Sequence, residues 1–244
     1  MKLEKKVIIV TGSSKGIGKE IALLLAKNGA KVVVNHSNSE TDAQATVESI
    51  LKNGGNAISI KADVSQKDEV IHLFDKTIET YGKVDVLINN AGIMFSKKLK
   101  DNTQEDFSKL FDVNVRGVFN TLQEADSKLA DHGKIINLSS STVKLMFPTY
   151  ALYSASKAAV EQMTRVFSKE IGRGISVNAL APGPTETNLF LEGKTPEFIE
   201  KLSAMNAFNR LAQPIDIANV VLFLASDDSK WISGQVIGAN GAMV

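Results

Sequence analysis

A tyrosine and a lysine lie four residues apart, at Tyr153 and Lys157. On a helix, this spacing places both side chains on one face. An ammonium group beside a phenol stabilises the phenolate, so we expect the pKa of Tyr153 to fall from about 10 towards neutrality. Tyr153 could then act as a general acid or base. The pair alone is a weak indication, because a chain with three tyrosines and 24 lysines can contain such a pair by chance.

Other polar residues follow segments that we predict to be strands. Ser140 comes just after an apolar run that ends at Leu138, and Asn90-Ala91-Gly92 follows a run that ends at Asn89. Ligands of parallel sheets bind at the carboxyl ends of the strands. Asn114 lies among valines in a predicted helix, where a buried amide is costly unless it has partners. Each feature has an ordinary structural explanation, such as a cap or a strand-ending turn, but together they indicate a site.

A glycine-rich turn follows the first predicted strand. It reads Thr11-Gly12-Ser13-Ser14-Lys15-Gly16-Ile17-Gly18 and leads directly into a helix. Its glycines allow a tight turn, a close approach of the backbone to a phosphate, and close packing of helix on sheet. The free N–H groups at the start of that helix favour an anion. A plain turn is the alternative, but its position favours a nucleotide site, and the spacing is not that of a P-loop.

The end of the second predicted strand lacks the acid that would indicate NAD. Such an acid usually lies about 20 residues after the glycine turn, where it binds the ribose 2′-hydroxyl. Here the segment reads Asn35-His36-Ser37-Asn38. Lys15 could neutralise a 2′-phosphate, although a solvated lysine is the alternative interpretation. Lys15, Asn35, Ser37 and Asn38 therefore predict that NADP(H) is favoured over NAD(H).

Short β-branched runs alternate with longer segments of helical period along the chain. The strand candidates are Val7–Val10, Lys31–Asn35, Ala57–Lys61, Val84–Asn89, Lys134–Leu138, Ile175–Leu180 and Gln235–Gly238. The helix candidates are a helix from the glycine turn to about Asn28-Gly29, Glu40–Lys52, Lys67–Tyr81, Thr103–Leu122, Tyr153–Ile171 and Pro214–Ala225. This order predicts an α/β fold, a single Rossmann-like doubly wound domain over residues 1–244. It would hold a seven-stranded parallel sheet with helices on both faces. Residues 188–213 break the rhythm, and we interpret them as a substrate lid inserted before the last helix.

Composition and charge exclude several classes of function. The chain has 244 residues, 28 of them basic and 27 acidic, and no cysteine. Disulfides and thiolate metal sites are therefore excluded, and a near-neutral chain has no field to gather nucleic acid or anionic lipid. The three histidines, His36, His72 and His132, lack ligand spacing, so we expect surface or loop histidines and no metal. With a charged start and no long apolar run, we expect a cytoplasmic protein with no membrane partner.

Taken in order, these motifs resemble those of the short-chain dehydrogenase/reductase family. The matching residues are the Thr11–Gly18 turn, Asp63-Val64, Asn89–Gly92, Asn114, Ser140, Tyr153 with Lys157, and Pro182-Gly183 with Thr187. The resemblance covers nearly the whole chain. It implies a Rossmann-like fold and a catalytic tetrad of Asn114, Ser140, Tyr153 and Lys157. For the cofactor it implies Asp63-Val64 near the adenine, Asn90, Tyr153 and Lys157 near the nicotinamide ribose, and Pro182, Gly183, Thr185 and Thr187 on the carboxamide.

The resemblance also implies a mechanism. Hydride passes from the nicotinamide to a carbonyl carbon while Tyr153 protonates the oxygen and Ser140 hydrogen-bonds it. Lys157 holds the ribose hydroxyls and keeps Tyr153 acidic, and Asn114 anchors a water that links Lys157 to solvent. The reverse reaction, oxidation of an alcohol, uses the same site.

The substrate is open to more than one hypothesis. Within the family the chain is most similar to the 3-oxoacyl-(acyl carrier protein) reductases, which act in fatty acid biosynthesis, and also to the naphthol-type ketone reductases. Leu145, Met146, Phe147, Phe190 and Phe208 are expected to line an apolar pocket, although plain core packing is the alternative.

The basic residues that a carrier protein would require are only partly present. Asp131-His132 stands where carrier-dependent reductases tend to have basic residues, which leaves Arg173 available and a group at Lys97, Lys98 and Lys100. Reduction of a 3-oxoacyl thioester is thus the first hypothesis, and a free ketone, quinone or sugar alcohol is the alternative. A regulator that binds the dinucleotide without catalysis is disfavoured, because all four tetrad positions are kept.

Two predicted helices carry more apolar residues than one buried face needs. They are Phe107, Leu110, Phe111, Val115, Val118 and Phe119 in the first, and Val160, Met163, Val166 and Phe167 in the second. Members of the family pair these helices across two-fold axes. We therefore expect a homotetramer.

Overall fold

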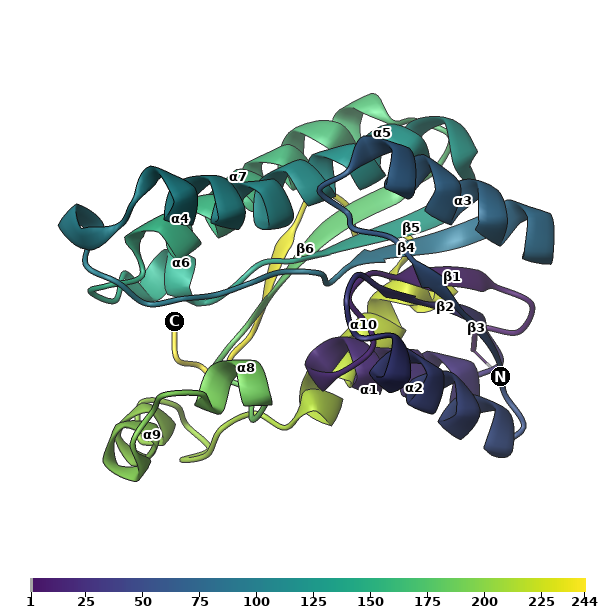
Figure 1. Cartoon of the computed structure of the whole chain (residues 1–244). Coiled ribbons are helices and arrows are strands. Elements are labelled where there is room, and N and C mark those ends of the chain that lie inside the picture. The colour runs from purple at the N-terminus through teal and green to yellow at the C-terminus, as the bar shows by residue number, and fades with distance from the viewer. Residues whose placement is uncertain (1) are drawn as a thin grey trace.

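The computed structural model describes residues 2–244, and its centre is a seven-stranded parallel sheet (Figure 1). The strand order is β3-β2-β1-β4-β5-β6-β7. The strands are β1 (Val7–Val10), β2 (Lys31–His36), β3 (Asn56–Lys61), β4 (Val84–Asn89), β5 (Leu129–Leu138), β6 (Ser176–Pro182) and β7 (Val236–Ala239). The direction of the chain across the sheet reverses between β1 and β4, which creates a crevice at the carboxyl ends of these strands. The predicted Rossmann-like α/β fold is confirmed.

Helices cover both faces of the sheet (Figure 1). One face packs against α1 (Gly16–Lys27), α2 (Glu40–Lys52) and α10 (Pro214–Ala225), and the other against α3 (Lys67–Tyr81), α5 (Gly117–Lys128) and α7 (Ala151–Glu170). Ile8 and Val10 of β1 point to the first set of helices and Ile9 to the second. Burial on both faces explains why β1 is apolar throughout. No helix within residues 2–244 has the length and apolar character needed to cross a membrane.

The helix that we expected at residues 103–122 is not one regular helix. It consists of α4 (Gln104–Phe111), a π-helical turn at Asp112–Arg116, and α5, which continues to Lys128. The wider turn contains Asn114, whose buried amide bonds to the main chain of Ile93. The prediction of one helix was wrong because the spacing of apolar residues hardly changes when a single π-helical turn interrupts an α-helix.

Strand β5 also starts earlier than expected, at Leu129 rather than Lys134. Leu129 pairs with Val84 of β4, and the register then shifts before Val86 pairs with Lys134. A bulge interrupts the alternation of side chains along the strand. The first residues of β5 therefore do not follow the pattern from which the strand was predicted.

Between β6 and α10, the chain forms two short helices, α8 (Asn188–Leu191) and α9 (Pro196–Ser203). The two ends of this segment are joined by a parallel bridge between Thr185 and Ala212. Ala212 N–H donates to Pro184 O at 2.9 Å, and Glu186 N–H donates to Ala212 O at 2.8 Å. The segment therefore leaves the sheet and returns to it at one closed base.

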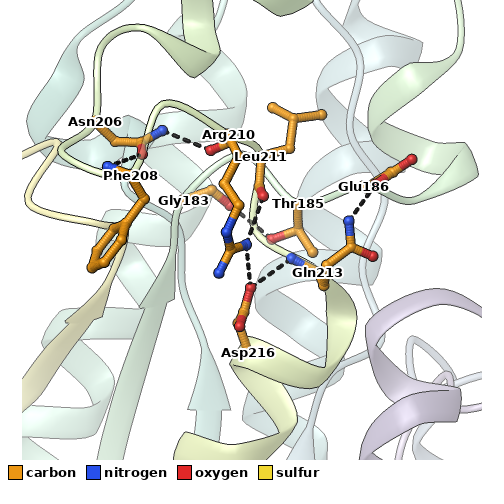
Figure 2. Close-up of polar contacts among 9 residues, drawn as sticks. All are labelled: Gly183, Thr185, Glu186, Asn206, Phe208, Arg210, Leu211, Gln213 and Asp216. Carbon is orange, nitrogen blue, oxygen red and sulfur yellow. Dashed lines mark hydrogen bonds and ion pairs between the residues drawn. The ribbon is translucent and has the colours of Figure 1, made fainter.

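Side chains reinforce this base, as Figure 2 shows. Asp216, in the first turn of α10, accepts hydrogen bonds from the Arg210 guanidinium at 2.6 Å and from Gln213 N–H at 2.8 Å. The Gln213 amide in turn donates to the Glu186 carboxylate. The outer part of the segment is tied to the C-terminal residues, because Ala207 N–H donates to Gly241 O at 2.9 Å.

Candidate active site

A cleft of about 1080 Å³ runs along the carboxyl edge of the sheet. Its walls come from the turns after strands β1 to β6 and from α8 and α9. All of the residues that the sequence analysis assigned to a cofactor line it: Gly12, Ser14, Lys15, Gly16, Ile17, Gly18, Asn35, Ser37, Asn38, Asp63, Val64, Asn90, Ala91, Gly92, Tyr153, Lys157, Pro182, Gly183, Thr185 and Thr187. The topology thus gathers residues from six separate segments along one groove.

The glycine turn requires its glycines for two different reasons. A Cβ added to Gly12 would lie 2.8 Å from the Cα of Ala91, and one added to Gly18 would lie 2.4 Å from Asn90 Nδ2. These two glycines therefore let the turn pack on the chain that follows β4. Gly16 has a positive φ of 58°, and the nearest atom to a Cβ there, on Thr187, would be 3.6 Å away. The backbone at Gly16 thus stays open to the cleft.

The start of α1 lacks a cap. Lys15 occupies the N-cap position, and its side chain makes no capping hydrogen bond. The first N–H groups of α1 have no partner within the helix, and together with the helix dipole they favour an anion. Open backbone at Gly16 and uncapped N–H groups beside it fit the pyrophosphate of a dinucleotide.

The turns after β1 and β4 are bonded to each other. Thr11 Oγ1 accepts from the N–H groups of Asn90 and Ala91, both at 3.0 Å. Asn90 Nδ2 donates to Thr11 O at 3.0 Å and to Gly12 O at 2.9 Å. The Asn90 amide nitrogen therefore holds the protein's own turn in place.

Asn35 has a similar structural role. Its Oδ1 accepts from Gly12 N–H at 3.2 Å, and its Nδ2 donates to Ala62 O at 3.0 Å. Asn35 lines the cleft, but its side chain fixes the position of the glycine turn on β2. Of the neutral residues expected to bind a 2′-phosphate, only Ser37 and Asn38 keep their side chains free of these contacts.

At the other end of the cleft, three side chains converge. Ser140 follows β5, and Tyr153 and Lys157 lie near the start of α7. Lys157 Nζ lies 5.9 Å from the centre of the Tyr153 ring and donates to Leu138 O at 2.8 Å. The strand end thus fixes the lysine, and the lysine lies beside the phenol.

Ser140 is oriented by a residue that sequence reasoning missed. Thr142 donates to Ser140 Oγ twice, from its N–H at 3.2 Å and from its hydroxyl at 3.0 Å. Two accepted bonds leave the Ser140 O–H as a donor towards the cleft. A hydroxyl two residues after a serine is a recognisable turn pattern, and it is the signal that could have identified Thr142.

The protonation of Tyr153 differs from the sequence prediction. Burial raises the pKa of Tyr153 to about 12, and a hydrogen bond with Ser140 only partly opposes the rise. Burial also lowers the pKa of Lys157 to about 8. The predicted drop in the pKa of Tyr153 is therefore wrong for the protein alone, because Lys157 bonds to Leu138 O and both groups are desolvated. At neutral pH, Tyr153 is a neutral phenol, the form that donates a proton.

Asn114 lies behind the cleft rather than in its wall. Its Oδ1 accepts from Ile93 N–H at 2.9 Å, and its Nδ2 donates to Ile93 O at 3.0 Å and Ser156 Oγ at 3.1 Å. A Cβ added to Gly92 would lie 3.2 Å from Asn114 Oδ1 and 3.5 Å from Lys157 Nζ. Asn114 thus ties the turn after β4 to α7 and lies next to the lysine, as a positioning residue.

Two of the residues expected in the apolar pocket lie outside it. Leu145, Phe147 and Phe190 line the cleft. Met146 does not, since it ends the short helix α6 (Thr142–Leu145) with a positive φ of 51° and is 79% exposed. Phe208 is 69% exposed beyond α9 and does not line the cleft either. Apolar character alone could not distinguish these positions.

Other apolar lining residues were missed. They include Met94 after β4, Tyr150 before α7, Leu189 in α8, and Phe198 and Leu202 in α9. The pair Thr195-Pro196, with the Thr195 hydroxyl as the cap of α9, was the available signal for a helix in this segment.

Two further expectations need correction. His36 is not a surface or loop residue, because it is the last residue of β2 and is 4% exposed. Arg173 is exposed, but its guanidinium already has partners within the chain: it donates to the carbonyl groups of Leu129 and Asp126 and pairs with Asp131 at 3.4 Å. Arg173 thus connects the segment after α7 to the end of α5 and the start of β5.

Comparisons with known proteins agree with this geometry. The family model described as enoyl-(acyl carrier protein) reductase matches residues 12–243. The versicolorin reductase stcU of Emericella nidulans is 42% identical, with 98% of this chain and 96% of that protein aligned. The trihydroxynaphthalene reductase PfmaI of Pestalotiopsis fici is 38% identical, over 98% of this chain and 89% of that protein.

A solved structure is equally similar. The angucycline C-6 ketoreductase LanV with bound NADP superposes with a TM-score of 0.94 at 38% identity, covering 99% of this chain and 96% of that one. The fold, the residues of the cleft and the similar proteins all indicate the same family, and the similarity extends over almost the whole chain. The chain belongs to the short-chain dehydrogenase/reductase family, as an oxidoreductase that acts with a nicotinamide dinucleotide on small carbonyl compounds.

Proposed function

We propose that this enzyme uses NADPH to reduce a ketone carried on a largely apolar, ring-shaped substrate to a secondary alcohol. One observation carries the proposal: Ser140, Tyr153 and Lys157 meet at one end of a continuous cleft. The uncapped start of α1 lines the same cleft, and so do the aromatic side chains of Phe147, Tyr150 and Phe190. A donor, an acid and a cation beside a dinucleotide groove are the groups that carbonyl reduction needs.

The residues divide the chemistry among them. The dihydronicotinamide, when bound, supplies the hydride that becomes the new C–H bond. Ser140, held by Thr142, donates to the carbonyl oxygen as negative charge develops there. Tyr153 gives its phenolic proton to the same oxygen and regains one from solvent. Lys157 keeps a positive charge beside the tyrosine, and Asn114 fixes the neighbouring backbone.

The preference for NADPH rests on charge. Lys15 is exposed in the turn beside the start of α1, and residues 35–38 contain no carboxylate. The first acid after β2 is Glu40, already in α2. A 2′-phosphate would therefore meet a lysine and neutral donors at Ser37 and Asn38. That LanV was solved with NADP supports the same preference.

The shape of the substrate is inferred from the cleft wall. Phe147, Tyr150, Phe190 and Phe198 give it flat aromatic surfaces, which suit a planar ring better than a flexible chain. The three named relatives act, by their names, on versicolorin, a trihydroxynaphthalene and an angucycline. We further propose that residues 188–213 act as a lid over this substrate, within one domain that spans residues 1–244.

A 3-oxoacyl thioester is the second candidate. The matching family model is described by an acyl carrier protein, which favours this substrate. However, Arg173 is bonded within the chain, and it lies at the far end of α7, whose 20 residues extend about 30 Å from the Tyr153 end. Recognition of an acidic carrier is therefore supported less well than a free ketone.

A homotetramer remains part of the proposal. Leu110, Val118 and Val160 pack in the chain's own core and need no partner. Phe107, Phe119 and Val166 remain about half exposed on α4, α5 and α7, and a two-fold contact would cover them. Light scattering at micromolar concentration should give about four times the mass of the chain, and a stable monomer would contradict this expectation.

The proposed reaction is tested by NADPH oxidation with three substrates: a bicyclic ring ketone, an open-chain ketone and an acetoacetyl thioester. We expect the largest kcat/KM with the ring ketone, and a kcat at least about 10²-fold lower in Tyr153→Phe. A thioester preference would replace the substrate proposal with the second candidate. As a control, Tyr153→Phe should fold and bind the cofactor as the wild type does. The loss of activity can then be assigned to the chemical step.

A further inference from the structure

Tyr150 places a second phenol in the cleft, beside Tyr153. It occupies the N-cap position of α7, lines the cleft and is 8% exposed. The centres of the two tyrosine rings are 6.3 Å apart, and their planes meet at 67°. The lining residues Met94 and Phe147, from the two segments next to Tyr150, are apolar. The proposed proton transfer does not use the Tyr150 hydroxyl, which lies in an otherwise apolar part of the wall.

The backbone just before Tyr150 is strained. Thr149 has a φ of 74°, in the left-handed region that a β-branched residue rarely adopts. Its carbonyl oxygen accepts from Lys97 N–H at 2.8 Å, and its Oγ1 lies 2.7 Å from Ser96 Oγ. A strained conformation persists only where the surrounding structure holds it. The segment after β4 therefore fixes Thr149, and with it the position of Tyr150.

The hydroxyl groups around Tyr150 form a chain of hydrogen bonds that has one direction. The Thr149 hydroxyl donates to Pro148 O, so Ser96 is the donor in its contact with Thr149. Ser96 has only this one proton to give, so its Oγ is the acceptor in its hydrogen bond with the Tyr150 hydroxyl. The carbonyl at the end of the chain has no proton to return. The Tyr150 O–H thus points to Ser96, and the phenol oxygen keeps its capacity to accept.

Tyr150 is also a neutral group. Burial raises the pKa of Tyr150, and the hydrogen bond with Ser96 opposes this rise only in part. At neutral pH the side chain is therefore a phenol rather than a phenolate. Because its proton is already bonded to Ser96, the phenol can accept a hydrogen bond from a ligand hydroxyl, but it has no proton for a ligand ether or carbonyl oxygen.

We propose that Tyr150 determines substrate specificity: its phenol oxygen accepts a hydrogen bond from a hydroxyl group of the substrate, while the ketone lies at Ser140 and Tyr153. The inference rests on the reduction of a ring ketone proposed above. Because the Tyr150 ring lies beside the Tyr153 ring, a bicyclic ketone bound at Tyr153 can bring a ring substituent to Tyr150. The preferred substrates are therefore hydroxylated aromatic ketones. A methyl ether at the same ring position is disfavoured, because it has no proton to donate.

The experiment compares substrates that differ in this one proton. NADPH oxidation is measured with α-tetralone, with its phenolic monohydroxy derivatives and with the corresponding methyl ethers. A hydroxyl and a methoxy group have similar electronic effects on the carbonyl, so the ratio of their kcat/KM values reports hydrogen-bond donation. In the wild type, we expect at least one hydroxy derivative to exceed both its methyl ether and α-tetralone by about tenfold.

Three variants assign the preference to a residue. Tyr150→Phe removes the acceptor, so the hydroxyl-to-ether ratio should fall to about equality. Ser96→Ala keeps the phenol but frees its proton, which can then be donated to an ether oxygen, so the ratio should fall by about threefold or more. Ser96 is exposed, and its substitution does not endanger folding. Tyr81→Phe, on α3 and outside the cleft, controls for the loss of a tyrosine hydroxyl and should keep the wild-type ratio.

The outcomes separate this inference from the proposed function. Reduction of all the tetralones with equal kcat/KM for hydroxyl and ether, or a wild-type ratio in Tyr150→Phe, would overturn the role of Tyr150 and leave the reduction of ring ketones standing. A wild-type ratio in Ser96→Ala would overturn the directed chain of hydrogen bonds. If no member of the series were reduced, the proposed function would fail, and this inference with it.

Discussion

The turn after β1 is bonded to the turn after β4 through four hydrogen bonds between Thr11, Gly12, Asn90 and Ala91, whereas the opposite wall of the cleft is made of the short helices α8 and α9. In the first region, an added Cβ at Gly12 or Gly18 would clash with backbone or side chain. In the second, large apolar side chains such as Leu189 and Phe198 remain substantially exposed.

This difference indicates that one wall of the cleft has a fixed geometry and that the other is less constrained. The wall formed by the turns after β1 and β4 is held by strand ends, and it leaves no room for a side chain at Gly12 or Gly18. The wall from residues 188 to 213 is fixed at its base by Thr185, Ala212 and Asp216, but its helices are only four and eight residues long. Short helices stabilise themselves poorly, so we expect this wall to adapt to a substrate.

The largest expected effect lies at the reacting end of the rigid wall. Tyr153→Phe removes the proton donor and little volume, so kcat should fall by at least about 10²-fold with folding unchanged. Steady-state kinetics and thermal melting measure both quantities. Tyr81→Phe, on α3 and bonded to Asn56, is the matched control and should keep full activity. Activity of Tyr153→Phe within threefold of the wild type would remove Tyr153 from the mechanism.

A pH effect should follow from the buried lysine. The pKa of Lys157 is lowered to about 8, so Lys157 is charged below that pH and neutral above it. The kcat/KM for NADPH in ketone reduction, which reports the free enzyme, should therefore decline above about pH 8 by up to about tenfold per unit. A profile that stays flat to about pH 10 would show that the charge of Lys157 is not needed.

Thr142 offers a smaller test of the rigid end. Thr142→Val keeps the shape but removes one of the two bonds to Ser140 Oγ, so kcat should fall by about tenfold at most. KM should change little, because the substrate pocket is intact. Thr142→Ser restores the hydroxyl and should restore kcat. A Thr142→Ser variant as slow as Thr142→Val would point to packing rather than to orientation of Ser140.

A substitution in the wall formed by residues 188–213 should change the KM for the ketone. Phe190 lines the cleft, and Lys194 lies 4.6 Å from the centre of its ring, whereas Phe208 lies outside. Phe190→Ala should raise the KM for a ring ketone about fivefold, the equivalent of about 1 kcal/mol. Phe208→Ala serves as the matched control and should stay within about twofold of the wild type. Equal effects of the two variants would contradict the assignment of the wall.

The smallest effect concerns the charge at the glycine turn. Lys15→Ala should weaken NADPH binding by up to about fivefold, since an exposed ion pair contributes up to about 1 kcal/mol. NADH binding should change less, because NADH lacks the phosphate. Fluorescence titration of both cofactors measures the ratio, with Lys52→Ala at the exposed end of α2 as the control. An equal loss for both cofactors would assign Lys15 to the pyrophosphate instead.

Much of the fold could be predicted because its signals are local. The apolar run Val7–Val10, the glycine turn and the periodic helix at Lys67–Tyr81 each carry their pattern within a few residues. The π-helical turn at Asp112–Arg116 carries no such pattern. It is stabilised by contacts of Asn114 with Ile93, 21 residues earlier in the chain, and of Gly117 with Val64.

The sequence by itself determined which residues reach the carboxyl edge of the sheet. Parallel strands joined by helices must all end at the same edge, so Gly12, Asn90 and Ser140 had to lie along one groove. Only the tertiary structure decided the state of those groups. The pKa of Tyr153, the exposure of Met146 and Phe208, and the burial of His36 depend on what surrounds each side chain. The surroundings of these side chains are set by segments distant in the sequence, so their own neighbours in the chain do not predict them.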